Sequence, residues 1–147
     1  MNRPLASTEE ERFLHEVDAF LANWKAHGSS LAAARDWRYG RFLLVGVDER
    51  IAPPSGCSID ALVGILRGLE GELGIEILGG GAIWYRDEAH DGFPTRVSRE
   101  VFEKLAESGE ISGDTMVFDL SLTRVGEARE GKWERPAREG WHRRYLR

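Results

Sequence analysis

The sequence predicts an α+β fold, a single globular domain of residues 1–147 in which helices pack on a mixed sheet of about four strands. Helical and strand-like hydrophobic periods follow one another in the order α-β-β-α-β-α-β. The chain has 147 residues, about the length of one domain, and shows no internal repeat and no interdomain linker. Hydrophobic residues make up 41% and charged residues 31% of it, which suffices for one packed core.

The first predicted element is a helix over residues 8–26. Ser7-Thr8-Glu9-Glu10 has the pattern of a capping box, in which the Ser7 hydroxyl accepts a hydrogen bond from a backbone amide of the first turn. Apolar side chains follow at helical spacing: Phe13, Val17, Phe20, Leu21 and Trp24. We expect Gly28 to end this helix and residues 1–7 to fray.

A β-hairpin is predicted next. Residues 31–37 and 41–48 read as extended segments, joined by Arg38-Tyr39-Gly40. Phe42-Leu43-Leu44-Val45 is apolar at every position, which is typical of a strand that is buried on both faces. We therefore expect the second strand to be central in the sheet.

A second helix follows the stiff, proline-containing loop of residues 52–56. Cys57 or Ser58 is expected to cap it, and its buried side carries leucine, valine and isoleucine at helical spacing. Gly74 followed by Ile75 predicts its C-terminal stop.

The remaining elements are shorter. A strand is predicted over residues 82–86, then a polar loop over 87–95. Ser98 is expected to cap a third helix that Gly109 closes. The last predicted strand covers residues 115–120. No regular period follows, so we expect 124–147 to be an irregular basic and aromatic segment packed on the rest of the chain.

Charge is unevenly distributed along the sequence. The whole chain carries a net charge of −5, but residues 131–147 contain six basic and two acidic side chains and carry +4. The other residues therefore form an acidic body of net charge −9, which argues against a protein that coats nucleic acid. The lone Cys57 permits no intramolecular disulfide and favours a reducing, cytoplasmic setting.

The first candidate site is Ser55-Gly56-Cys57-Ser58-Ile59-Asp60, between a predicted strand and a predicted helix. Helix N-terminal amides favour anions and thiolates, whereas neighbouring carboxylates disfavour a thiolate. Two alternatives stay open: Cys57 as a small buried residue beside turn and cap serines, and Cys57 as a nucleophile or redox thiol. The expected ligand-binding residues here are Asp48, Glu49, Ser55, Gly56, Ser58 and Asp60.

The second candidate site is the C-terminal strip Trp141-His142-Arg143-Arg144-Tyr145. Arginine pairs recognise phosphate or carboxylate in a fork geometry, and Trp141 offers a stacking face, so we expect Trp141, Arg143 and Arg144 to bind ligand. The alternative is that the strip folds back on the acidic body, where Arg143 and Arg144 would clasp the carboxylates near the Cys57 loop.

Several strings together resemble a family of small bacterial proteins of no assigned activity, over about residues 20–144. They include Trp24-x-x-His27-Gly28, Ser-Gly-Cys-Ser-Ile-Asp at 55–60, and Trp141-His142-x-Arg144, which follows Gly140 where the resemblance implies serine. Members carry the label ABC transporter ATPase. This sequence has no G-x-x-x-x-G-K-[S/T] string, hence neither the lysine for the β/γ-phosphates nor the hydroxyl for Mg²⁺, so we do not expect an ATPase.

We therefore expect a cytoplasmic protein that binds a small anionic ligand or a protein partner near the Cys57 loop and the C-terminal strip. The competing prediction is a cysteine-dependent enzyme, with Cys57 as nucleophile or redox thiol and His142 as base. No cofactor and no metal are expected, because the metal-capable residues 87–91 have no second ligand cluster. A membrane or nucleic acid is not expected as a partner, and a homodimer stays open.

Overall fold

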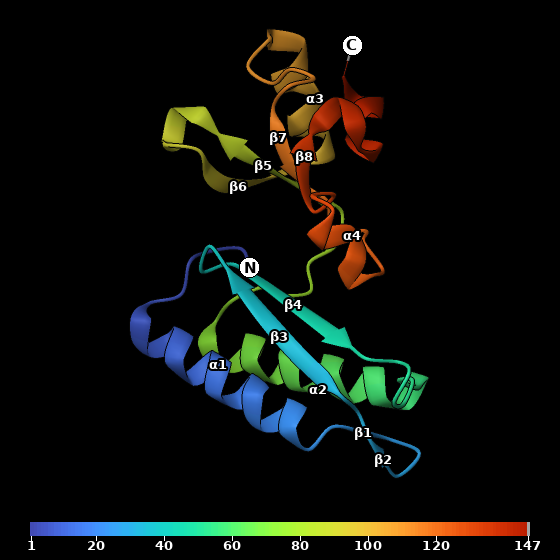
Figure 1. The fold of residues 1–147 in the computed structure, drawn as a ribbon. Coiled ribbons are helices and arrows are strands. Elements are labelled where there is room, and N and C mark those ends of the chain that lie inside the picture. The colour runs from blue at the N-terminus through green and yellow to red at the C-terminus, as the bar shows by residue number, and fades with distance from the viewer. Residues whose placement is uncertain (147) are drawn as a thin grey trace. The chain divides into compact units, whose positions relative to one another are not determined.

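The computed structural model in Figure 1 describes residues 1–146. It confirms the α+β class, because helices and antiparallel strands alternate along the chain. The chain divides into two compact units, Met1–Gly79 and Gly80–Arg147, and each has its own cluster of buried apolar side chains. Among residues 1–146, no helix combines the length and the apolarity needed to cross a bilayer.

In the first unit two helices lie side by side and a β-hairpin crosses them (Figure 1). Its elements are α1 (Ser7–Ala22), β1 (Lys25–Ala26), β2 (Ser29–Ser30), β3 (Ala33–Arg38), β4 (Phe42–Val47) and α2 (Gly56–Leu73). Phe13 and Val17 of α1 are fully buried, and the Phe13 ring lies 5.3 Å from that of Trp37 on the hairpin. The predicted hairpin is confirmed, with Trp37 opposite Leu43.

The hairpin forms a sheet of its own. β4 pairs antiparallel with β3 in a two-stranded sheet, so the expectation of a central strand is wrong. One face of β4 packs on the helices through Leu43, Val45 and Val47. The apolar residues of its other face, Phe42 and Leu44, are also buried or half-buried, which explains the uninterrupted apolar run without a third strand.

The second unit is built on a four-stranded antiparallel sheet of order β6-β5-β7-β8. Its elements are β5 (Ala82–Asp87), the 3₁₀ helix η1 (Glu88–His90), β6 (Phe93–Ser98), α3 (Arg99–Ser108), β7 (Met116–Phe118), α4 (Val125–Arg129), β8 (Glu134–Pro136), and the 3₁₀ helices η2 (Ala137–Glu139) and η3 (Trp141–Tyr145). α3 packs against the sheet through Phe102, whose ring is fully buried beside that of Tyr85. η3 packs on α3.

The ends of the second and third helices follow local signals. α2 begins earlier than predicted, with Ser55 as its N-cap, because Ser55 and not Cys57 or Ser58 supplies the capping hydroxyl. It ends at Gly74, as predicted, and the φ of +60° there is a left-handed conformation that glycine adopts without strain. For α3, Ser98 caps the first turn and Gly109 follows the last, as predicted.

The N-terminal expectations need correction. α1 stops at Ala22, four residues before the predicted end, because residues 25–26 pair as a strand with 29–30. Its N-cap is Ala6, whose backbone N–H donates to the Glu9 carboxylate at 2.8 Å, so Ser7 is not the cap. Residues 1–7 are tied down rather than frayed, since the buried Met1 donates from its amino group to the Arg41 carbonyl at 2.7 Å.

Two segments that the sequence predicts to be irregular contain regular elements. The predicted loop of residues 87–95 contains η1 and the start of β6. Pro94 makes this strand hard to predict, because proline is disfavoured in the interior of a sheet. β6 lies at the edge of the sheet, where proline is tolerated. Residues 124–147 include α4, β8 and two 3₁₀ helices, each too short to show a hydrophobic period.

Candidate functional site

The Cys57 loop is the first turn of α2. The Ser58 backbone N–H donates to Ser55 Oγ at 3.2 Å, and the Ser55 N–H donates to Ser58 Oγ at 2.7 Å. The Trp24 indole N–H donates to the Ser58 carbonyl at 2.8 Å within the core. The capping interpretation of the two serines is confirmed. Cys57 and Gly56 are exposed, so the interpretation of Cys57 as a buried packing residue is wrong.

The carboxylates expected beside this loop are engaged locally or exposed. Nε and Nη2 of Arg50 donate to the Asp48 carboxylate at 2.9 and 2.6 Å, and this pairing lowers the pKa of Asp48 to about 2. Glu49 and Asp60 are exposed. Because β4 runs antiparallel to β3, these residues do not lie at the carboxyl edge of a parallel sheet, where ligands collect.

Most charges of residues 131–147 are paired within the second unit. The ion pairs join Arg135 with Asp119, Arg138 with Asp114, Lys132 with Glu130, and Glu134 with Arg86. Arg143 and Arg144 differ, because both are exposed and neither has a carboxylate partner among residues 1–146. Arg147, the last basic residue of the segment, lies outside the described residues. The positive charge left over is therefore concentrated on η3.

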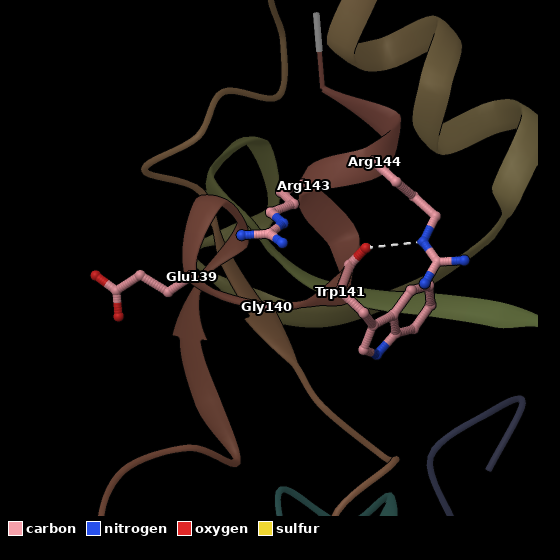
Figure 2. A pocket seen from close by; sticks show the side chains of 5 residues that line it. All are labelled: Glu139, Gly140, Trp141, Arg143 and Arg144. Atoms are coloured by element: carbon pink, nitrogen blue, oxygen red, sulfur yellow. Dashed lines mark hydrogen bonds between the residues drawn. The ribbon is translucent and has the colours of Figure 1, made fainter.

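A pocket of about 460 Å³ opens at this point of the second unit (Figure 2). We call it the C-terminal pocket; it is lined by Glu139, Gly140, Trp141, Arg143 and Arg144. The guanidinium carbon of Arg144 lies 5.6 Å from the centre of the Trp141 ring, and its Nε donates to the Trp141 carbonyl at 3.1 Å. The Arg143 side chain projects on the Glu139 side of the pocket, away from the indole (Figure 2).

Further cationic character comes from α3. The guanidinium carbon of Arg99 lies 6.0 Å from the centre of the Trp141 ring. Like Arg143, Arg99 is exposed and forms no ion pair among residues 1–146. Glu139 is the one acidic residue of the pocket lining, and its carboxylate lies 4.0 Å from Nη2 of Arg138. Two guanidiniums, those of Arg99 and Arg144, thus lie near the Trp141 ring, and Arg143 adds a third on the Glu139 side of the pocket.

A buried carboxylate anchors the wall of the pocket. Asp119, 1% exposed, forms an ion pair with Arg135 and accepts hydrogen bonds from the Trp141 indole N–H at 3.1 Å and the Ser121 backbone N–H at 3.0 Å. Burial alone would raise the pKa of Asp119, but the hydrogen bonds from Ser121 and the charge of Arg135 outweigh it and hold this pKa below its usual value. Asp119 therefore stays ionised and fixes the indole.

His142 is fully buried and lies against Gly140 and Trp141, two residues of the pocket lining. Its ring stacks on Trp141, with 4.0 Å between ring centres, and lies 6.4 Å from the ring of Phe102. Neither ring nitrogen has a hydrogen-bond partner among residues 1–146. Burial lowers the pKa of His142 to about 4; the charges of Arg135 and Arg144 act in the same direction, whereas Asp119 opposes them. The imidazole is thus neutral at physiological pH.

Gly140 is required by the close approach of two side chains. A Cβ at this position would lie 2.8 Å from Nδ1 of His142 and 3.2 Å from Nε of Arg135. We expect Gly140→Ala to lower the free energy of unfolding of the second unit by about 1–3 kcal/mol, because two packed side chains must move. Gly126→Ala is the matched control, since a Cβ there meets nothing within 4 Å. Equal stabilities of the two variants in urea denaturation would contradict this packing.

The sequence-predicted residues fall into two groups. Trp141, Arg143 and Arg144 share the C-terminal pocket, whereas the residues around Cys57 belong to the first unit. Cys57 and His142, the predicted nucleophile and base, belong to different units, and full burial makes His142 a poor base toward a thiol outside its own cluster. The predicted pairing of Cys57 as nucleophile with His142 as base therefore gains no support.

Sequence reasoning missed Asp119, Arg135, Glu139 and Gly140 as parts of the site. Asp119 directly follows the apolar strand Met116–Phe118, and an acid in that position is a signal that could have singled it out. Arg135 carries no such signal, since it is one of six basic residues among 131–147. No group of three or more metal-binding side chains occurs within residues 1–146.

Comparison of the chain with protein-family models, with curated proteins and with solved structures gives no match.

Proposed function

We propose that this protein binds a small oxyanion, such as sulfate, phosphate or a carboxylate, in the C-terminal pocket. The observation that carries the proposal is that Arg143 and Arg144 line a pocket and have no carboxylate partner among residues 1–146, although Lys132, Arg135 and Arg138 of the same segment are paired. Arginine forks match the geometry of oxyanions, and each charge-assisted hydrogen bond is stronger than a neutral one.

The surroundings of the two arginines support this function. Trp141 is fixed by its hydrogen bond to Asp119, so the pocket wall is preorganised before a ligand arrives. Arg99 adds attraction for anions near the same ring. A protein partner that presents an acidic side chain would offer the same chemistry as a small carboxylate. A cytoplasmic location suits the proposal, because a reducing compartment preserves the exposed thiol of Cys57.

The test is titration with sulfate by isothermal calorimetry at low ionic strength, where such contacts are least screened. We expect saturable binding to the wild-type protein and about a hundredfold weaker binding to the double variant Arg143→Ala with Arg144→Ala, because two charge-assisted contacts are lost. The charge-matched control is Arg124→Ala with Arg129→Ala, two exposed arginines at α4 of the same unit. Equal losses in both double variants, or no saturable binding to the wild type, would refute the proposal.

A cysteine-dependent enzyme remains the second candidate, and one observation favours it: Cys57 is exposed in the first turn of the 18-residue helix α2. If anion binding is the function instead, Cys57 should react with iodoacetamide within about threefold of the rate of free cysteine at neutral pH. The second-order rate of alkylation of the native protein measures this. A rate about a hundredfold higher would favour a catalytic or redox thiol over the proposal above.

A further inference from the structure

Two buried nitrogens next to Gly140, a residue of the C-terminal pocket, have no hydrogen-bond partner in the described part of the chain. They are Nδ1 of His142 and Nε of Arg135. Buried polar atoms are nearly always paired, and each exception is costly enough to need an explanation. Nε2 of His142 is unpartnered as well.

Both nitrogens converge on one residue of the pocket lining. The Cβ position of Gly140 lies 2.8 Å from Nδ1 of His142 and 3.2 Å from Nε of Arg135, and Nη2 of Arg135 lies at 3.6 Å. Gly140 also lines the pocket, and the His142 ring stacks on Trp141, a second lining residue. The imidazole and the Arg135 guanidinium therefore lie next to residues that line the pocket.

The carboxylate nearest to this cluster is already fully engaged. Asp119 is bonded to Arg135, to Ser121 and to the Trp141 indole. In the absence of a further negative charge, burial and the neighbouring arginines hold the pKa of His142 at about 4, so the ring is neutral. An anion in the pocket would supply the missing charge close to the ring and would favour its protonated form.

We propose that anion binding at the C-terminal pocket is coupled to proton uptake by His142, so that the buried imidazolium and Arg135 form the positive floor of the occupied site. The inference rests on the proposed anion-binding function and deepens it. The ligand is bound together with one proton, and the affinity for oxyanions rises as the pH falls.

Three charged groups act on the imidazole: Asp119 after β7, Arg135 of β8 and Arg144 of η3. The elements that pack nearby add Glu139 of η2 with its neighbour Arg138, Arg143 of η3 at the pocket, and Arg99 of α3 and Tyr145 of η3 beside Trp141. Glu139 lines the pocket, so its carboxylate also acts on a bound anion. A test must therefore separate His142 from Glu139.

The experiment is a sulfate titration by calorimetry at pH 5 and at pH 7.5, since sulfate itself keeps a charge of −2 over this range. A bound anion that raises the pKa of His142 by about two units would make sulfate binding about tenfold tighter at pH 5. Glu139→Gln removes the competing carboxylate and should preserve this ratio. His142→Met replaces the ring by an apolar side chain of similar volume and should bring the ratio close to one.

A second measurement uses the wild-type protein alone. The ¹⁵N chemical shifts of the His142 ring at pH 5 should report a neutral imidazole without sulfate and an imidazolium at saturating sulfate. Sulfate binding with a neutral ring, or a pH ratio that persists in His142→Met, would overturn the inference and leave the proposed function standing. Absence of sulfate binding at both pH values would overturn the proposed function, and the inference with it.

Discussion

Replacing Asp119 by alanine is expected to lower the free energy of unfolding of the second unit by about 3–5 kcal/mol. The carboxylate is 1% exposed, and its ion-pair partner Arg135 has a side chain only 22% exposed. Removal of the carboxylate leaves a largely buried guanidinium without its counter-charge and the Trp141 indole N–H without its acceptor. The expected loss of stability arises from the buried polar groups that are left without a partner. It exceeds the net contribution of the intact ion pair to stability.

Urea denaturation followed through amide NMR signals of β7 and β8 measures this loss within the second unit. Asp114→Ala is the matched control, because Asp114 pairs with Arg138 at the surface with a side chain 80% exposed, and should change stability by no more than about 1 kcal/mol. The double variant Asp119→Ala with Arg135→Met should recover part of the loss, since no buried charge is then left behind. Similar effects of Asp119→Ala and Asp114→Ala would mean that the buried pair does not anchor this unit.

Acidification from about pH 7 to pH 4 is expected to remove about 3 kcal/mol of stability from the second unit through His142 alone. The pKa of His142 is about 4 in the folded protein, against an ordinary value of 6.5 that applies to the unfolded chain. The unfolded chain therefore binds the proton first. The stabilising effect of the neutral ring is complete above pH 6.5 and is lost as the pH falls toward 4. Asp119, whose pKa is also depressed, adds a further loss at still lower pH.

The variant His142→Met separates the contribution of His142 from the other causes of the stability loss at low pH. Since neither ring nitrogen of His142 has a hydrogen-bond partner within residues 1–146, the apolar replacement should cost little stability at pH 7 and should flatten the stability profile between pH 6.5 and pH 4. His15→Gln, at an exposed position of α1, should leave the profile unchanged. Free energies of unfolding from urea titrations at several pH values provide the comparison. A profile of unchanged slope in His142→Met would show that the buried ring does not titrate as described.

The elements that could be predicted from the sequence are those with local signals. α3 shows this best, because Ser98 and Gly109 bracket an apolar stripe that needs no distant partner to be recognised. β6 could not be predicted from the sequence, because a strand tolerates proline, here Pro94, only at the edge of a sheet. Whether a strand lies at an edge depends on the assembled sheet. β8 spans three residues, too few for any period to appear.

The candidate site likewise contains residues that local sequence signals predict and residues that they do not. Trp141, Arg143 and Arg144 could be chosen from residue type alone, since paired arginines beside an indole suit anion binding wherever they lie. The pairing of Asp119 with Arg135 joins positions 16 residues apart and depends on the register of β7 against β8. Arg143 and Arg144 of η3 have no carboxylate partner in the described part of the chain, and nothing in the local sequence distinguishes them from the paired Arg135 and Arg138.

The most direct test of anion binding at the C-terminal pocket is an NMR titration with sulfate that follows the Arg Nε–H and Trp indole N–H signals. We expect the signals of Arg143, Arg144 and Trp141 to shift along one common saturation curve. The paired Arg35, which donates to Asp18 in the first unit, should not shift. Shifts that grow without saturation, or that spread equally over Arg35 and the other arginines, would contradict a defined site at this pocket.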